Sequence, residues 1–261
     1  MGTSRGLDTA GYIAREGALE KVTEPYRPVV AAARERLVEV YGDRLHSGYL
    51  YGSIARGTAV PYRADLDLLA VLREEPTDAD RADADTVQKA LEAAYPQLNG
   101  GGVLTMSVTT ALSEVERHDL GFFVACLCTP LVGPDLATGL PRYRPTVELA
   151  RDTNGDLAEA LDRFRADTGP PARLCRGAAR KIVRTGFTLV MPRWGGWTSD
   201  LELSAELCGR HYPERAERLR RAAVLAHDPV DDPDAIAMLL DDLGPWLAAE
   251  YARTIGVRTP R

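Results

Sequence analysis

The chain has 261 residues, enough for one large domain or two smaller domains that each bury a hydrophobic core. Its formal net charge of −6 argues against a nonspecific nucleic-acid binder, and its composition is typical of a globular protein. No stretch approaches the roughly 18 apolar residues of a membrane span, and residues 1–21 hold no apolar core of signal-peptide length. We therefore expect a cytoplasmic protein without a nucleic-acid or membrane partner.

Helix and strand patterns alternate in the first half of the chain. The periodicity of apolar residues predicts helices at 28–41 and 78–98, and strands at 47–53, 65–72, 103–110 and 130–136. The apolar segment 121–128 is compatible with either a helix or a strand.

The composition changes after Tyr143. From Val147 onward, helical patterns are separated by breaks rich in proline and glycine. We predict an α/β (α+β) domain with a small mixed sheet over residues 1–143, followed by an all-α helical bundle domain over residues 144–261.

The most informative stretch runs from Leu50 to Leu72. Gly52-Ser53 follows an apolar strand, and Asp65-Leu66-Asp67 opens the next strand. Residues two apart in a strand point to the same face, so both carboxylates are directed to one spot. Burying a charge is costly without a partner, and paired carboxylates suit Mg²⁺, which is often bound together with substrate phosphates. A Gly-Ser turn lets backbone N–H groups and a hydroxyl approach a phosphate closely.

This combination resembles the signature of the polymerase-β-like nucleotidyltransferase superfamily. Within that superfamily the chain is most similar to the streptomycin/spectinomycin adenylyltransferases, and residues 130–136 resemble a closing segment of that group. The resemblance implies that Gly52 and Ser53 hold the triphosphate of ATP, and that Asp65 and Asp67 bind Mg²⁺ and are catalytic. Arg56 lies in the same loop, where it could reach a phosphate or be a solvated loop cation.

The helical half offers further candidates for the nucleotide and the acceptor. Arg184 belongs to a basic helix face that could meet a triphosphate, although a solvated face is the simpler interpretation; the other members are Arg176, Arg180 and Lys181. Arg193 precedes Trp194 and Trp197, which could stack on a base or a sugar or could be ordinary packing residues.

One departure from the family concerns a third acidic residue in the next strand. That strand reads Leu104-Thr105-Met106-Ser107 here, and we expect Thr105 at the position of the third carboxylate. The nearest acids are Glu114 and Glu116, beyond the strand. A missing general base commonly removes a factor of about 10²–10⁴ from the rate.

The function that we expect is transfer of AMP from ATP to a hydroxyl of a small, aminoglycoside-like molecule, in antibiotic resistance or in biosynthesis. The missing carboxylate leaves open a catalytically impaired, nucleotide-binding or antitoxin-like protein of the same fold. Arg221 and His227 also meet the loose spacing of helical ribonuclease toxins, but Ala222 follows the arginine where those proteins usually carry a polar residue.

Overall fold

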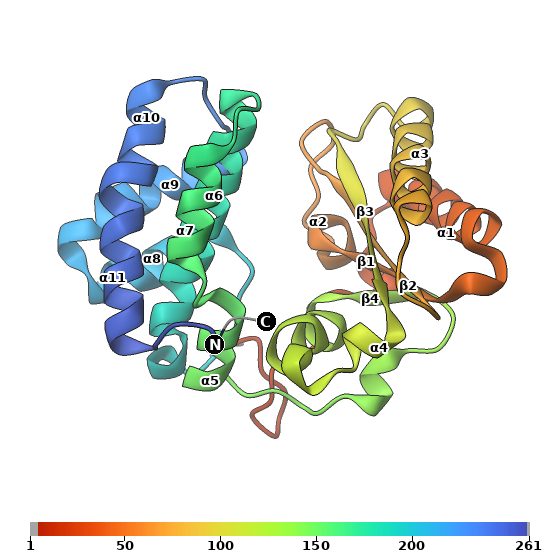
Figure 1. The fold of residues 1–261 in the computed structure, drawn as a ribbon, viewed down its shortest axis with the longest axis horizontal. Helices are drawn as coiled ribbons and strands as arrows, with labels where there is room; N and C mark the ends of the chain where they lie inside the picture. Colours follow the sequence, from red (N-terminus) through yellow and green to blue (C-terminus); the bar gives the residue numbers. More distant parts are fainter. Residues whose placement is uncertain (1–4, 260–261) are drawn as a thin grey trace. The chain divides into compact units, whose positions relative to one another are not determined.

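The computed structural model describes residues 5–259, which divide into two compact units (Figure 1). The sheet unit comprises residues 14–142, and the helical unit combines residues 5–13 with residues 143–259. The domain limits 1–143 and 144–261 stay a prediction, and they include residues 1–4 and 260–261, which lie outside the described part. The contacts of residues 5–13 place this segment with the helical unit.

The sheet unit is built on four strands in the order β3-β2-β1-β4. They are β1 (Leu45–Tyr51), β2 (Leu66–Leu72), β3 (Gly101–Ser107) and β4 (Thr129–Val132). β1 is antiparallel to β2 and β4, whereas β3 is parallel to β2. The predicted small mixed sheet is therefore confirmed.

Helices and shorter turns cover both faces of this sheet. The helices are α1 (Arg27–Tyr41), α2 (Gly52–Arg56), α3 (Asp78–Ala94) and α4 (Val108–Ala111). Figure 1 shows α1 and α3 together on one side of the sheet, where Leu66 and Leu68 join their core. On the other face, Leu69 and Val71 pack with residues of the segment 106–136. Much of the undecided segment 121–128 is helical, including Phe123–Leu127.

The helical unit is organised around one long helix. Its helices are α5 (Val147–Asn154), α6 (Leu157–Ala166), α7 (Pro171–Trp194), α8 (Leu201–His211), α9 (Ala216–His227), α10 (Pro233–Ala237) and α11 (Gly244–Thr254). Residues 185–191 of α7 are all buried, because other helices of the unit pack around this part of it. The predicted helical second half is confirmed. No described helix is both long and apolar enough to cross a membrane.

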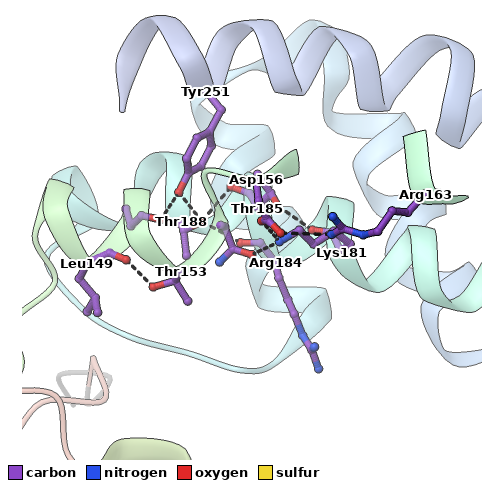
Figure 2. A network of polar contacts seen from close by, with 11 residues as sticks. Leu149, Thr153, Asp156, Arg163, Lys181, Arg184, Thr185, Thr188 and Tyr251 are labelled. Atoms are coloured by element: carbon purple, nitrogen blue, oxygen red, sulfur yellow. Dashed lines mark hydrogen bonds and ion pairs between the residues drawn. The ribbon is translucent and has the colours of Figure 1, made fainter. Parts of the chain in front are cut away.

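A polar network ties α5, α7 and α11 together inside this unit (Figure 2). The Tyr251 hydroxyl donates to the carbonyl of Ala150 at 2.5 Å and to the Thr188 hydroxyl at 3.0 Å. Nearby, the Lys181 ammonium pairs with Asp156. Burial is the largest single influence and would raise the pKa of Asp156, but the Lys181 charge and the hydrogen bonds to the carboxylate together outweigh it, so the pKa is lowered.

Helix α3 begins with a capping box that includes a buried carboxylate. The backbone N–H of Thr77 donates to Asp80 Oδ2 at 2.8 Å, and the Asp80 N–H donates to Thr77 Oγ1 at 3.3 Å. Arg44 pairs with the other oxygen of Asp80. The hydrogen bonds from Thr77, together with the Arg44 charge, lower the pKa of Asp80 despite its burial. The folded state therefore favours the ionised carboxylate.

Asp80→Asn should lower the free energy of unfolding by about 1 kcal/mol at pH 7. A lowered pKa gives stability that is present above the ordinary aspartate pKa and lost as the pH falls through the folded value. Urea unfolding should therefore show the gap between variant and wild type shrinking from pH 7 to pH 3. Asp78→Asn, in the same first turn but exposed, is the control and should change little. An unchanged gap at pH 3 would contradict the role of this charge.

Candidate functional site

The register of β1 and β2 brings the two halves of the sequence motif together. In this antiparallel pair, Tyr51 at the end of β1 lies opposite Asp67 near the start of β2. Gly52 and Ser53 leave β1 directly after Tyr51 and open α2. The Gly-Ser turn and the aspartate pair therefore meet at one end of the sheet, although Gly52 and Asp65 are thirteen positions apart in the chain.

Gly52 is required by both its backbone and its neighbour. Its φ of +79° is in the left-handed region, which side chains rarely adopt, and a Cβ at this position would overlap Asp67 Oδ2. The absence of a side chain lets the backbone of the turn pass directly over the Asp67 carboxylate. Any group bound by this turn must therefore lie close to that carboxylate.

The Asp67 carboxylate is on the face of the sheet opposite α1 and α3. Asp67 alternates in β2 with Leu66 and Leu68, which point to those helices, and shares its face with Leu69. Asp65 directly precedes the strand and lies 3.6 Å, through Oδ1, from the position of a Cβ on Gly100. Both aspartates are half-buried. They are thus accessible to a cation and partly shielded from water, which strengthens their attraction for it.

The expectation that Thr105 occupies the third-acid position was wrong by one residue. In the parallel pair of β2 and β3, Thr105 lies beside Ala70, whose side chain points to the face of α1. The residues beside Asp67 and Leu69 are Gly102 and Leu104. The carboxylate face of β3 therefore carries a glycine and a leucine that is 48% exposed.

Among the described residues, no other acidic side chain joins Asp65 and Asp67 in place of the third carboxylate. Glu114 and Glu116 lie in a short helical turn after β3, where Glu114 is exposed and pairs with Arg117 at 2.7 Å and Glu116 is half-buried. Within residues 5–259 there is no group of three or more acidic, histidine or cysteine side chains placed to hold a metal ion. Two carboxylates, with phosphate oxygens and water, still fit the preferences of Mg²⁺.

Arg56 ends α2, one turn after Ser53, and has a partner that sequence reasoning missed. Its guanidinium Nη1 lies 3.7 Å from Glu16 Oε2, and the two side chains are 30% and 13% exposed. Glu16 is forty residues away in the chain, and no sequence pattern links the two positions.

Arg184 and Arg193 are exposed residues of α7 in the helical unit, so their part in the site stays a prediction. Figure 2 shows the Arg184 side chain extending away from the polar network of that unit. Two other members of its basic face have structural contacts, because Lys181 pairs with Asp156 and Arg180 donates to the Ala226 carbonyl.

The neighbouring tryptophans follow the packing interpretation. Trp194 and Trp197 both make edge-to-face contacts with Phe187, at ring-centroid distances of 5.8 and 5.6 Å. Only 8% of Trp197 is exposed.

The ribonuclease-like spacing does not form a site. Arg221 and His227 lie six positions apart on α9, which places them about 120° apart around the helix axis. Arg221 instead approaches Asp232, at 3.9 Å.

Gly52→Ala should lower the free energy of unfolding by about 1–3 kcal/mol and displace the Asp67 carboxylate, since it combines an unfavourable φ with steric overlap. Gly102→Ala is the matched control on the other side of Asp67. A Cβ there meets no atom within 4 Å and φ is not positive, so this variant should be neutral or slightly stabilising. Denaturant unfolding of both variants checks the comparison, and equal stabilities would contradict the close approach at Gly52.

Comparison with known proteins agrees with this geometry. Residues 33–98, which span β1, α2 and β2, match the family described as "Nucleotidyltransferase domain". No curated protein matches the sequence significantly. The fold is similar to the crystal structure of the spectinomycin adenyltransferase AAD(9) from Enterococcus faecialis with ATP and spectinomycin, with a TM-score of 0.56 and 15% identity over 85% of this chain and 98% of that chain. The predicted resemblance is confirmed: residues 33–98 match a nucleotidyltransferase domain, which indicates an enzyme of that class, and the fold of the chain is similar to that of an adenylyltransferase.

Proposed function

We propose that this protein transfers AMP from ATP to a hydroxyl group of a small, aminoglycoside-like molecule with the help of Mg²⁺. The observation that carries the proposal is the passage of the Gly52-Ser53 turn over Asp67, with Asp65 beside the same strand end. A phosphate held by that turn would lie next to the Asp67 carboxylate, with Asp65 two residues before it in the chain. The structural neighbour was solved with ATP and spectinomycin, which supports the choice of nucleotide and acceptor class.

Each candidate residue of the sheet unit has a distinct role in this proposal. Asp65 and Asp67 would hold Mg²⁺, which when bound neutralises phosphate charge and orients the triphosphate. Ser53 would donate its hydroxyl and backbone N–H to phosphate oxygens, and Arg56 would add positive charge one helical turn away. Arg184 and Arg193 are candidates for further contacts with the nucleotide or the acceptor from the helical unit.

The reaction forms one bond and breaks another at the α-phosphorus of ATP. The acceptor oxygen bonds to phosphorus, the bond to the bridging oxygen breaks, and pyrophosphate leaves. The acceptor proton must pass to a base or to water. Because β3 (Gly101–Ser107) carries no acidic residue, this proton is not taken by a carboxylate of that strand.

Asp65→Asn and Asp67→Asn should each reduce Mg²⁺-dependent turnover by about a hundredfold or more. Metal stabilisation is worth several kcal/mol, and each 1.4 kcal/mol is a factor of ten. The assay incubates the protein with each NTP, Mg²⁺ and a panel of hydroxylated acceptors, and measures pyrophosphate and product mass. The fold should remain intact, because removing one of two like charges relieves repulsion. Wild-type turnover and Mg²⁺–ATP affinity in both variants would refute the metal role.

Leu104→Glu tests whether the absence of a base on β3 limits the rate. It places a carboxylate on the face of Asp67, so we expect kcat to rise by about tenfold or more. Thr105→Glu is the matched control, since its side chain is on the opposite face and should bring no gain. If both variants lose activity equally, the proton is already removed efficiently by another route.

A further inference from the structure

The segment before α1 lies against α2 and supplies the carboxylate that faces Arg56. Within this segment, Ala18 N–H donates to the carbonyl of Ala55 at 3.1 Å, in the turn of α2 that precedes Arg56. On its other side, Glu16 N–H donates to the carbonyl of Cys126 at 2.9 Å. The backbone of Glu16 is therefore fixed between α2 and the helical segment before β4.

A hydrogen bond to Glu16 and the close packing of the next residue, Gly17, also hold this part of the chain in place. The Lys21 ammonium donates to the Glu16 carbonyl at 2.6 Å. At Gly17, a Cβ would overlap Thr129 Oγ1 and lie 2.9 Å from the Ala55 side chain, so only glycine allows this approach. The Glu16 carboxylate is thus presented to Arg56 from a rigid backbone rather than from a mobile loop.

The ion pair has the properties of a positioning contact. Exposed pairs contribute little, but Glu16 is only 13% exposed and Arg56 is 30% exposed, so solvent screens this pair less. A guanidinium has five N–H donors in a planar fork, and the approach of Nη1 to Glu16 leaves donors for a second anion. An arginine side chain otherwise loses rotamer entropy when a ligand immobilises it.

The position of Arg56 relative to Ser53 indicates that its guanidinium lies on the side of the Gly52-Ser53 turn. Residues three apart on a helix share a face, and helical side chains tilt toward the helix N-terminus. Arg56 is three residues after Ser53 and therefore shares its face, on the side where the Gly-Ser turn passes over Asp67.

We propose that Glu16 is a positioning residue that orders the Arg56 guanidinium for the triphosphate of the nucleotide. This inference rests on the proposed function, because it assigns the nucleotide to the Gly52-Ser53 turn. Glu16 itself makes no contact with the nucleotide; it reduces the entropy that Arg56 loses on binding.

The test measures the affinity of the full chain for a non-hydrolysable ATP analogue and for AMP, both with Mg²⁺, by isothermal titration calorimetry. Glu16→Gln should raise the Kd of the ATP analogue about five- to tenfold and change the Kd of AMP much less, because AMP lacks the β- and γ-phosphates. Glu16→Asp keeps the charge and should give an intermediate value. Glu39→Gln, which breaks an exposed pair with Arg36 on α1, is the matched control and should bind like wild type.

A double-mutant cycle decides whether Glu16 acts through Arg56. Arg56→Gln should raise the Kd of the ATP analogue about tenfold, and adding Glu16→Gln should raise it little more. An unchanged Kd in Glu16→Gln, an equal loss for AMP, or a double variant that shows the product of both single effects would each overturn the inference. If Asp65→Asn and Asp67→Asn also bind the analogue normally, the proposed function fails as well; if only these two lose binding, the proposed function stands and the role of Glu16 does not.

Discussion

In the ladder of β1 and β2, the residue before the Gly-Ser turn is paired with Asp67, so the chain that leaves β1 must pass directly over a carboxylate. Only a residue without a Cβ fits there, and the left-handed φ of Gly52 makes the same demand independently. This close approach places Ser53 next to the metal-binding candidates and starts α2, which carries Arg56. A strand register set by the hydrophobic core thereby positions groups that contribute nothing to that core.

The same register explains the electrostatics of the site. Two half-buried carboxylates two residues apart in the chain repel each other, and a bound cation relieves that repulsion. A third acid on β3 would make the potential at the site more negative and would offer a proton acceptor. On the face of Asp67, however, β3 carries Gly102, where a side chain would meet no other atom, and the exposed Leu104. In the proposed function, the sheet unit supplies the groups that bind the nucleotide, whereas deprotonation of the acceptor depends on other groups.

The parts of this site that follow from local spacing could be predicted from the sequence. The strand period of two aligned Asp65 with Asp67, and the Gly-Ser turn before them was enough to indicate a nucleotidyltransferase domain. The position of β3 against β2 could not be predicted, because a slip of one residue exchanges the two faces and the run Leu104-Thr105 has no pattern that excludes it. The Glu16–Arg56 pair was missed for a different reason, since it depends on a fold that brings together residues forty positions apart.

The chain passes between the two units twice, at residues 13–14 and again at residues 142–143. Residues 5–13 are bonded to the helical unit at both ends: Trp197 N–H donates to the Arg5 carbonyl and Ile13 N–H to the Tyr143 carbonyl, both at 2.8 Å. Between these two hydrogen bonds, the Arg144 guanidinium lies 4.1 Å from the centre of the Tyr12 ring. The helical unit is thus assembled from two separate pieces of the chain. Recombination that exchanged only the part after residue 143 would retain residues 5–13, whose contacts are fitted to the helices that were lost. Residues 5–13 and the helices that they contact would therefore have to be exchanged together.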